Sequence, residues 1–320
     1  MEHRFSRRAF VAALAALPLA ARAQAYPAKA VTIVVPSLPG GVLDVVARTL
    51  APQMSDDLHQ SVVVDNRPGG NSHIGASLVA RSKPDGYTLL CAAGSTLVSG
   101  VSRNLNYEPM SDLVPVARVV TAPVYVVVSA DSPFKTLADL IEASKSKPGT
   151  IFFGSTSVGN STHIGAEMLN TLAGMGASHV PYKGAVPALT DLAGGRIHFM
   201  LDSLASVNPM LQSGKIRMLA VTAPARVKDF PNVPTVAETL PGFQIEGWVG
   251  VFAPAATPAE IVDKLAGAIE QATKNAEVAK TLRAASGEVA FLGPAEARIF
   301  MNEDHERIIK VVRAANIVID

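Results

Sequence analysis

Two short loops rich in glycine and hydroxyl side chains are the segments of this sequence best suited to bind an anion. The first, residues 36–41, reads Pro-Ser-Leu-Pro-Gly-Gly and stands between a β-branched run and a segment with helical periodicity. Glycine lets the backbone approach a ligand closely, and the helix that follows offers unpaired N–H groups with a partial positive charge. A carboxylate or a phosphate suits such a position. A tight strand–helix connection is the alternative explanation of a lone Gly-Gly pair.

A second loop of the same kind occupies residues 154–163, again between a predicted strand and a predicted helix. Its hydroxyl groups can donate hydrogen bonds to carboxylate oxygens, although Ser161 could instead cap the helix. Because ligands of open α/β sheets bind beyond the carboxyl ends of strands, both loops should face a common cleft. The hydroxyl-bearing candidates are Ser155, Ser157, Ser161 and Thr162.

Two aspartates could select the other end of a ligand by accepting hydrogen bonds from its amine or hydroxyl groups. They are Asp44 and Asp202, although Asp44 also suits the first turn of a helix for structural reasons. Arg67, in a third loop, could meet an anion or brace its own loop. His73 and His163 have no second His or Cys at the short spacing of a zinc site. We therefore expect no metal and no cofactor.

The segments that must position these loops alternate short β-branched runs with longer amphipathic stretches. This alternation predicts an α/β fold with mostly parallel sheets flanked by helices. The first series predicts strands at 31–35, 62–65 and 88–92, with helices at 43–58 and 74–83. The second series predicts strands at 124–129, 151–154, 179–180 and 198–201, with helices at 137–147, 162–173 and 185–193.

The 320 residues exceed what one hydrophobic core usually supports, so the two series predict two lobes. Residues 114–120 should carry the chain into the second lobe, and a Pro-rich stretch followed by a strand that contains Trp248 should return it. We expect these crossings to form a hinge that closes on a ligand. The predicted bounds are 26–121 plus 222–251 for lobe 1, and 122–221 plus 252–320 for lobe 2.

The N-terminal segment differs from the rest of the chain. Arg4, Arg7 and Arg8 precede an apolar run at residues 9–21 that ends in alternating alanines, the pattern of a cleaved export signal. The run is shorter than the ~20 residues of a membrane-spanning helix. The arginine pair also resembles a twin-arginine signal, so the export route stays open. We expect a periplasmic protein whose signal peptide occupies residues 1–25.

The composition argues against several classes of protein. Hydrophobic residues make up 48% and charged residues 17% of the chain, which suits buried α/β layers and not a disordered protein or a coiled coil. Loss of residues 1–23 would remove four of the 28 basic and one of the 27 acidic residues. The nearly neutral remainder has no basic stripe for nucleic acid. The single cysteine, Cys91, has no partner for an intramolecular disulfide.

From residue 26 to the C-terminus, the sequence resembles the receptor proteins of tripartite tricarboxylate transporters, also called Bug-type extracytoplasmic solute receptors. The resemblance rests on short motifs that occur in family order. They include Tyr26-Pro27-Ala28-Lys29, Gly40-Gly41 with Asp44, Asn66-Arg67-Pro68-Gly69, Pro84-Asp85-Gly86-Tyr87-Thr88-Leu89, His179-Val180-Pro181-Tyr182-Lys183-Gly184, Asp191-Leu192 with Gly194-Gly195, and Trp248 with Gly250.

The resemblance implies a two-lobe periplasmic binding protein of the Venus-flytrap, type II-like kind, which passes a small organic acid to a membrane permease. In similar proteins the amides and hydroxyls of two Gly/Ser loops hold the ligand carboxylate, partly through ordered waters. By position, those loops are residues 38–44 and 155–163, and we expect a monomer. Together with Asp202, the candidate contacts are Leu38, Gly40, Gly41, Leu43, Asp44, Ser155, Ser157, Asn160, Ser161, Thr162 and His163.

The sequence departs from the family pattern at the first loop. Leu38 and Leu43 stand where relatives usually carry small or hydroxyl-bearing residues. Because leucine removes polar contacts from the rim of the site, we hypothesise a ligand with an apolar body, such as an aromatic or aliphatic acid.

Two other functions compete with transport. A hydrolase could use Ser157, His163 and Asp202, but the chain has no G-x-S-x-G motif, and we expect a binding protein and not an enzyme. A receptor that reports ligand occupancy to a membrane sensor would have the same sequence features.

Overall fold

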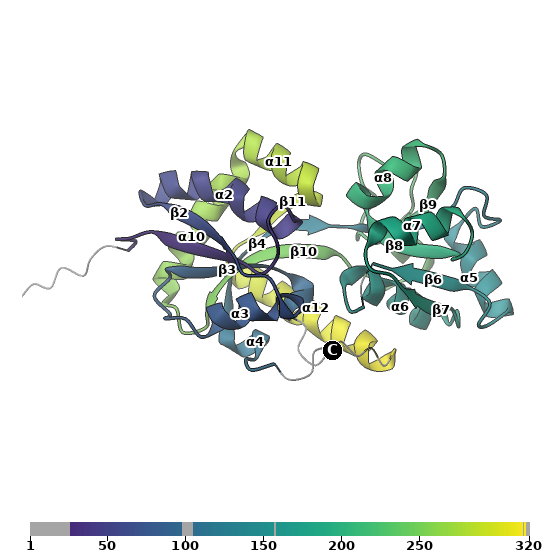
Figure 1. The fold of residues 1–320 in the computed structure, drawn as a ribbon, viewed down its shortest axis with the longest axis horizontal. Coiled ribbons are helices and arrows are strands. Elements are labelled where there is room, and N and C mark those ends of the chain that lie inside the picture. The colour runs from purple at the N-terminus through teal and green to yellow at the C-terminus, as the bar shows by residue number, and fades with distance from the viewer. Residues whose placement is uncertain (1–25, 98–104, 157, 316, 318–320) are drawn as a thin grey trace, which may run out of the picture.

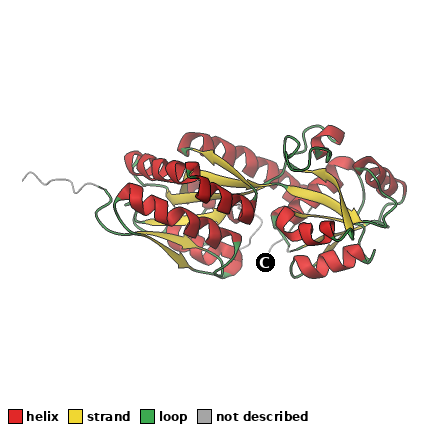
Figure 2. Cartoon of the chain, turned by 90° about the horizontal axis from the view of Figure 1, so that it is seen from above, coloured by secondary structure: helices red, strands yellow, loops and turns green. Residues whose placement is uncertain are grey.

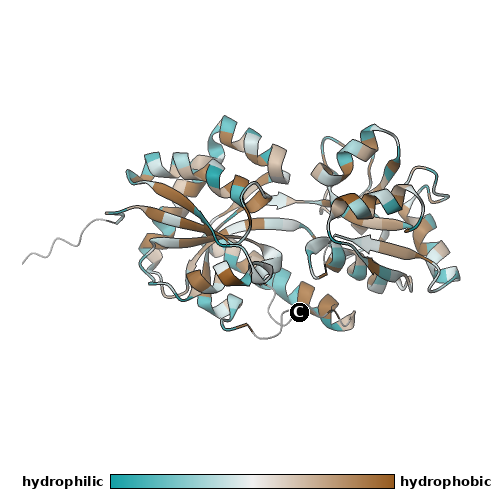
Figure 3. Cartoon of the chain, in the orientation of Figure 1, coloured by the Kyte–Doolittle hydropathy of each residue, from teal (hydrophilic) through white to brown (hydrophobic). Residues whose placement is uncertain are grey.

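The computed structural model describes residues 26–97, 105–156, 158–315 and 317, which form two α/β lobes. The lobes lie side by side along the longest axis of the molecule (Figure 1). Seen from above, helices cover the strands in both lobes (Figure 2). The strands are mostly hydrophobic, whereas the helices alternate hydrophobic and hydrophilic residues (Figure 3). This pattern is typical of sheets buried between amphipathic helices. The predicted export signal lies outside the described residues.

The first lobe is built on a six-stranded mixed sheet in the order β11-β4-β10-β3-β1-β2. Strands β1, β2 and β3 pair in parallel, while β10 runs antiparallel to both β3 and β4, and β11 antiparallel to β4. The bounds are β1 Val31–Val35, β2 Val62–Asn66, β3 Thr88–Ala93, β4 Leu113–Ala122, β10 Gly247–Pro254 and β11 Glu288–Leu292.

Helices cover both faces of this sheet. Helices α2, α10 and α11 pack on one face through Leu50, Met54, Leu265 and Ile269. On the other face, α3, α4 and the first half of α12 enclose a core around Trp248. The bounds are α2 Val42–Leu58, η1 Gly70–Ser72, α3 His73–Ala80, η2 Gly94–Leu97, α4 Pro109–Asp112, α10 Ala259–Lys274, α11 Ala276–Ser286 and α12 Pro294–Ala314.

The second lobe contains a five-stranded sheet in the order β7-β6-β8-β5-β9. Only β5 runs against its neighbours, since β6, β7 and β8 are parallel and β5 is antiparallel to β8 and β9. Helices α5 and α6 lie on one face, and α7 and α8 lie on the other. The bounds are β5 Val124–Ser129, α5 Leu137–Ser146, β6 Phe152–Ser155, α6 Ser161–Ala173, β7 Ser178–Pro181, α7 Ala185–Ala193, β8 Phe199–Ser203, α8 Leu204–Gln212, β9 Ile216–Val221 and α9 Val236–Thr239.

Within the described residues, three segments cross between the lobes. The chain enters the second lobe between β4 and β5, and returns to the first along β10. Helix α12 then runs from the first lobe, where Met301 is buried, to the second, where Ile308 and Val312 join the core. Strands β3 and β8 have their carboxyl ends at the edge that faces the other lobe. A strand that comes from the other lobe starts at this edge, so β10 and β5 are antiparallel to them.

The lobe assignment of two segments corrects the sequence prediction. Residues 222–251 were expected on lobe 1, but their apolar side chains as far as Ile245 pack in the second lobe. Residues 252–320 were expected on lobe 2, but α10, α11 and β11 cover the first lobe, and only the second half of α12 reaches the second. Hydrophobic periodicity shows that a helix buries one face, but it does not say against which sheet.

Candidate functional site

The carboxyl ends of β1, β2 and β3 lie at the edge of the first sheet that faces the second lobe. Strand β10 enters this sheet from the second lobe at Gly247, and its Val249 pairs in antiparallel fashion with Ala93, the last residue of β3. The end of β3 therefore lies beside the crossing. Because β1 is parallel to β3 and β2 is parallel to β1, the loops that follow them open toward the second lobe.

The second lobe mirrors this arrangement. Strand β5 starts at the crossing with Val124, whose partner is Ser203 at the carboxyl end of β8. Strands β6 and β7 run parallel to β8, so the loop after Ser155 opens toward the first lobe. A Cβ atom built on Gly247 would lie 3.7 Å from Oγ of Ser161, which places the start of α6 beside the crossing strand. The two loops singled out in the sequence thus lie on facing edges of the two sheets.

Asp44 organises the first loop. Its Oδ2 accepts a 2.9 Å hydrogen bond from the N–H of Gly40, which has φ +86°, and its Oδ1 accepts one of 2.9 Å from Nδ2 of Asn66. Nε of Arg48 donates to both oxygens at 3.0 Å. Burial opposes ionisation of this carboxyl, but the hydrogen bonds from Arg48, Gly40 and Asn66 hold its pKa below the usual value. The carboxylate of Asp44 is therefore used by the protein to shape the loop.

The first turn of α2 keeps its backbone donors available. Gly41 caps this helix without a side-chain hydrogen bond. Its carbonyl accepts the first intrahelical hydrogen bond, from the N–H of Val45. The N–H groups of the residues between Gly41 and Val45 therefore have no acceptor within the helix. Leu38 is 70% exposed at the loop tip, whereas Leu43 packs against the first-lobe core. Of the two leucines, it is Leu38 that stays open to solvent.

Asn160 organises the second loop and caps α6. Its Oδ1 accepts hydrogen bonds from the N–H of His163 (3.0 Å) and from Oγ1 of Thr162 (2.8 Å). Its Nδ2 donates to Oγ1 of Thr156 at 2.7 Å. Asn160, and not Ser161, is therefore the cap, which leaves the partly exposed hydroxyl of Ser161 beside the crossing strand. Ser157 lies outside the described residues.

Two stacked histidines form the floor beneath this loop. The rings of His163 and His179 lie 3.9 Å apart between centroids, and Nδ1 of His163 accepts a 3.0 Å hydrogen bond from the N–H of Gly159. Burial and the neighbouring His179 lower the pKa of His163 to about 4. Nε2 of His179 lies 2.7 Å from Oγ of Ser155, which has no exposed surface. His163 and Ser155 thus support the loop from below.

Asp202 keeps one acceptor without a partner. This residue stands in β8 just before its last residue, Ser203, pairs with Tyr125 of β5, and is 4% exposed. Its Oδ1 accepts a 2.7 Å hydrogen bond from the N–H of Ser203, whereas Oδ2 is buried and has no hydrogen-bond partner among the described residues. Burial raises the pKa of this carboxyl. Buried polar atoms without a partner are rare and call for an explanation.

The connection after β7 belongs to the same edge, although the sequence analysis names none of its residues as a candidate contact. The N–H of Tyr182 donates to the carbonyl of Ser155 (3.0 Å), and that of Gly184 donates to the carbonyl of Thr156 (2.9 Å). These bonds place Lys183 and Val186 next to the hydroxyl-rich loop. The sequence offers a sign of this position, because residues 181–184 follow the strand predicted at 179–180 and precede a predicted helix.

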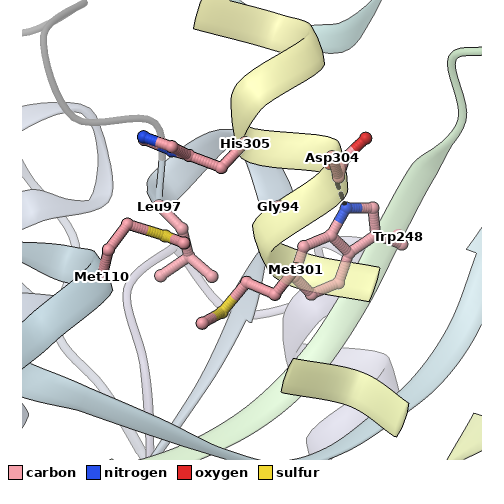
Figure 4. Close-up of a pocket in the computed structure, with 7 residues that line it drawn as sticks. All are labelled: Gly94, Leu97, Met110, Trp248, Met301, Asp304 and His305. Carbon is pink, nitrogen blue, oxygen red and sulfur yellow. Dashed lines mark hydrogen bonds between the residues drawn. The ribbon is translucent and has the colours of Figure 1, made fainter. Parts of the chain in front are cut away.

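Trp248 lies on the crossing strand but inside the first lobe. Its indole is 5% exposed and packs beneath Gly94, and it adjoins a cavity of about 10 Å³ (Figure 4). That volume suits one water molecule and is too small for an organic acid. Trp248 is therefore a core residue of the first lobe beside the crossing, and its role in a hinge stays a prediction.

The described residues offer neither a membrane span nor a metal centre. None of their helices is both long and apolar enough to cross a bilayer. They also contain no group of three or more His, Cys, Asp or Glu side chains that could hold a metal ion.

Comparison with known proteins identifies the family. The tripartite tricarboxylate transporter family receptor model matches residues 46–317. BugT of Bordetella pertussis is 35% identical over 295 residues, which cover 91% of this chain and 90% of BugT. A Rhodopseudomonas palustris protein solved with adipate has a TM-score of 0.75 and 34% identity, with 92% of this chain and 99% of that chain covered. MatC from Rhodopseudomonas palustris, with bound malate, has a TM-score of 0.71 and 30% identity, with 90% and 100% covered. The chain belongs to the tripartite tricarboxylate transporter receptor family of solute-binding proteins.

Proposed function

We propose that this protein is a periplasmic receptor that captures a small organic carboxylate between its lobes and delivers it to the permease of a tripartite tricarboxylate transporter. The observation that carries the proposal is the placement of the two loops. Residues 36–41 and 156–160 follow strands whose carboxyl ends face each other across the crossing strands. The solved relatives with adipate and malate support a carboxylate as the ligand class.

The contacts follow from the groups that the fold leaves open. The carboxylate sits at the first turn of α2, near the N–H groups that follow Gly41, and receives the Ser161 hydroxyl from the second lobe. Asp44 and Asn160 hold the loops in shape, and a ligand donor or a bridging water satisfies Oδ2 of Asp202. Charge-assisted hydrogen bonds at ~1.5–3 kcal/mol each suffice for the roughly −8 kcal/mol of micromolar binding after ordering costs.

Closure follows from binding to both lobes. A ligand on the first lobe gains the contacts of the second only when the cleft closes, so binding shifts the open–closed equilibrium. A serine–histidine pair is present at Ser155 and His179, but Ser155 has no exposed surface, and the Ser157 of the hydrolase alternative lies outside the described residues.

Thermal unfolding and calorimetric titration with a panel of organic acids test the capture step. An acid that binds only the folded state raises the melting temperature as its concentration rises. The matching neutral amides are the control and should leave the melting temperature unchanged. Small-angle X-ray scattering should show a smaller radius of gyration with the acid bound. If amides bind as well as acids, the proposed capture of the carboxylate group is wrong.

Uptake by cells tests the delivery step. Deletion of the gene should abolish high-affinity uptake of the acid that titrates best, and the wild-type gene should restore it. Unchanged uptake with a lost transcriptional response to the acid would contradict delivery and would favour the sensor alternative.

A further inference from the structure

We infer that the acid held by this receptor has an apolar body, and that apolar side chains on both facing edges select it. The inference rests on the proposed function, because it names the class of acid that the same site takes. Leu38, Val42 and Ile74 provide this surface on the first lobe, and Val158 and Val186 provide it on the second. We call these five residues the apolar rim.

The apolar rim is exposed on both lobes. Leu38 is 70%, Val42 45% and Ile74 57% exposed, while Val158 is 37% and Val186 76% exposed. Each lies in a loop, or in the first turn of a helix, that follows the carboxyl end of a strand at the crossing edge. Side chains from segments far apart in the sequence thus stand on the facing edges of the two sheets.

The gathering of these side chains is unusual. Single exposed apolar residues are normal on a soluble protein, whereas their concentration at one place marks a binding surface. Half of the large hydrophobic side chains that stay exposed among the described residues belong to the apolar rim. Others, such as Leu172 near the end of α6 and Val63 near the amino end of β2, stand at the ends of their elements opposite the crossing edge.

The glycines of the third loop make room for one rim side chain. A Cβ atom built on Gly69 would lie 2.8 Å from Cδ1 of Ile74, and one on Gly70 would lie 3.2 Å from its Cγ1. Ile74 therefore packs over the bare backbone of this loop, with more than half of its surface still open to solvent. The loop presents an apolar side chain where a polar one would offer contacts to a hydroxylated ligand.

The charged groups at these edges are mostly engaged by the protein. Arg48 is ion-paired with Asp44, and Arg67 with Asp65. Lys183 is exposed and has no ion pair among the described residues, so its ammonium group is left for a second carboxylate. Asp202 offers a single acceptor. The hydroxyl groups of a hydroxyl-rich acid would lose their hydrogen bonds to water when they contact the apolar rim. Few protein groups are left there to replace those hydrogen bonds.

Titration of the wild-type protein tests the class of acid. We expect hexanoate, adipate or benzoate to bind at least tenfold more tightly than malate and citrate, because their bodies bury apolar surface against the rim. Equal or tighter binding of malate or citrate would overturn the inference while leaving carboxylate capture intact. Binding of none of these acids would instead remove the proposed function on which the inference rests.

Rim variants with matched controls test the residues. Leu38→Ser and Val186→Ser should each weaken binding of the best acid by about three- to tenfold, with little change in melting temperature, because both side chains are exposed in the free protein. Leu172→Ser and Val63→Ser, at side chains 54% and 46% exposed, are the controls and should keep wild-type affinity. Unchanged affinity in both rim variants, or an equal loss in all four variants, would contradict the assignment.

Discussion

The indole Nε1 of Trp248 donates a 2.8 Å hydrogen bond to Oδ2 of Asp304, joining the crossing strand β10 to the crossing helix α12. Oδ1 of the same carboxylate accepts a 2.8 Å hydrogen bond from Nη2 of Arg307, whose Nη1 reaches Oε1 of Gln244 at 3.3 Å. Trp248 and Asp304 are almost fully buried. Two of the three connections between the lobes are thus held together at one point.

Loss of this hydrogen bond should destabilise the protein. Trp248→Phe keeps an aromatic ring but leaves Oδ2 of the buried Asp304 without its donor. Hydrogen bonds to charged groups contribute roughly 1.5–3 kcal/mol, so we expect a loss of that size in the free energy of unfolding. Urea unfolding followed by circular dichroism measures it, since the variant has no tryptophan left for fluorescence. A variant as stable as wild type would show that the hydrogen bond contributes little.

Gly94 should tolerate no side chain, because the indole lies against its backbone. A Cβ atom built on Gly94 would lie 2.2 Å from Nε1 of Trp248, so Gly94→Ala must displace the ring. We expect a loss of about 1–3 kcal/mol, the usual cost of overpacking. Gly267 in α10 is the matched control, because a Cβ there would meet nothing within 4 Å. Gly267→Ala should stabilise the helix by roughly 0.5–1 kcal/mol, and a loss in both variants would contradict the steric explanation.

The sequence predicts the elements and the position of the loops well. Strands 31–35 and 124–129 and helix 185–193 have the same bounds in the structure, because β-branched runs and turn residues mark their ends. The loops follow from the strands, since a ligand site in an α/β sheet lies beyond the carboxyl ends.

Contacts between distant segments were not predictable in the same way. The carboxylate of Asp44 meets Asn66 22 residues later, and His163 stacks on His179 from another element. No local pattern encodes these pairs, because they depend on how elements pack. The same limit explains the reversed lobe assignment of the Pro-rich segment and of α10, whose amphipathic pattern fits either sheet.

The buried His163 should make stability depend on pH. Above pH 6.5 the ring is neutral in both states and contributes nothing. As the pH falls from 6.5 to about 4, the unfolded chain binds the proton before the folded protein does. The free energy of unfolding therefore decreases by up to about 3 kcal/mol over this range. Below it, both states are protonated and the decrease stops. Urea unfolding at pH 7, 5.5 and 4.5 measures the slope. His163→Asn should flatten it, and an unchanged slope would place its origin at other groups.

The two helix caps Asn160 and Asn275 separate stability from binding. Oδ1 of Asn160 accepts from the N–H of His163 at the cleft, and Oδ1 of Asn275 accepts from the N–H of Glu277 at α11 on the first lobe. Replacement of either residue by alanine removes a cap and should cost ~1 kcal/mol, read as a lower midpoint of urea unfolding.

Only one of these two variants should bind ligand less well. In Asn160→Ala the loop also loses its hydrogen bond to Thr156, so the groups offered to the carboxylate are no longer held in place before the ligand arrives. Calorimetric titration should then show about tenfold weaker binding for Asn160→Ala and wild-type affinity for Asn275→Ala. Equal affinities in the two variants would mean that the order of the second loop does not matter for capture, because both proteins have lost one cap.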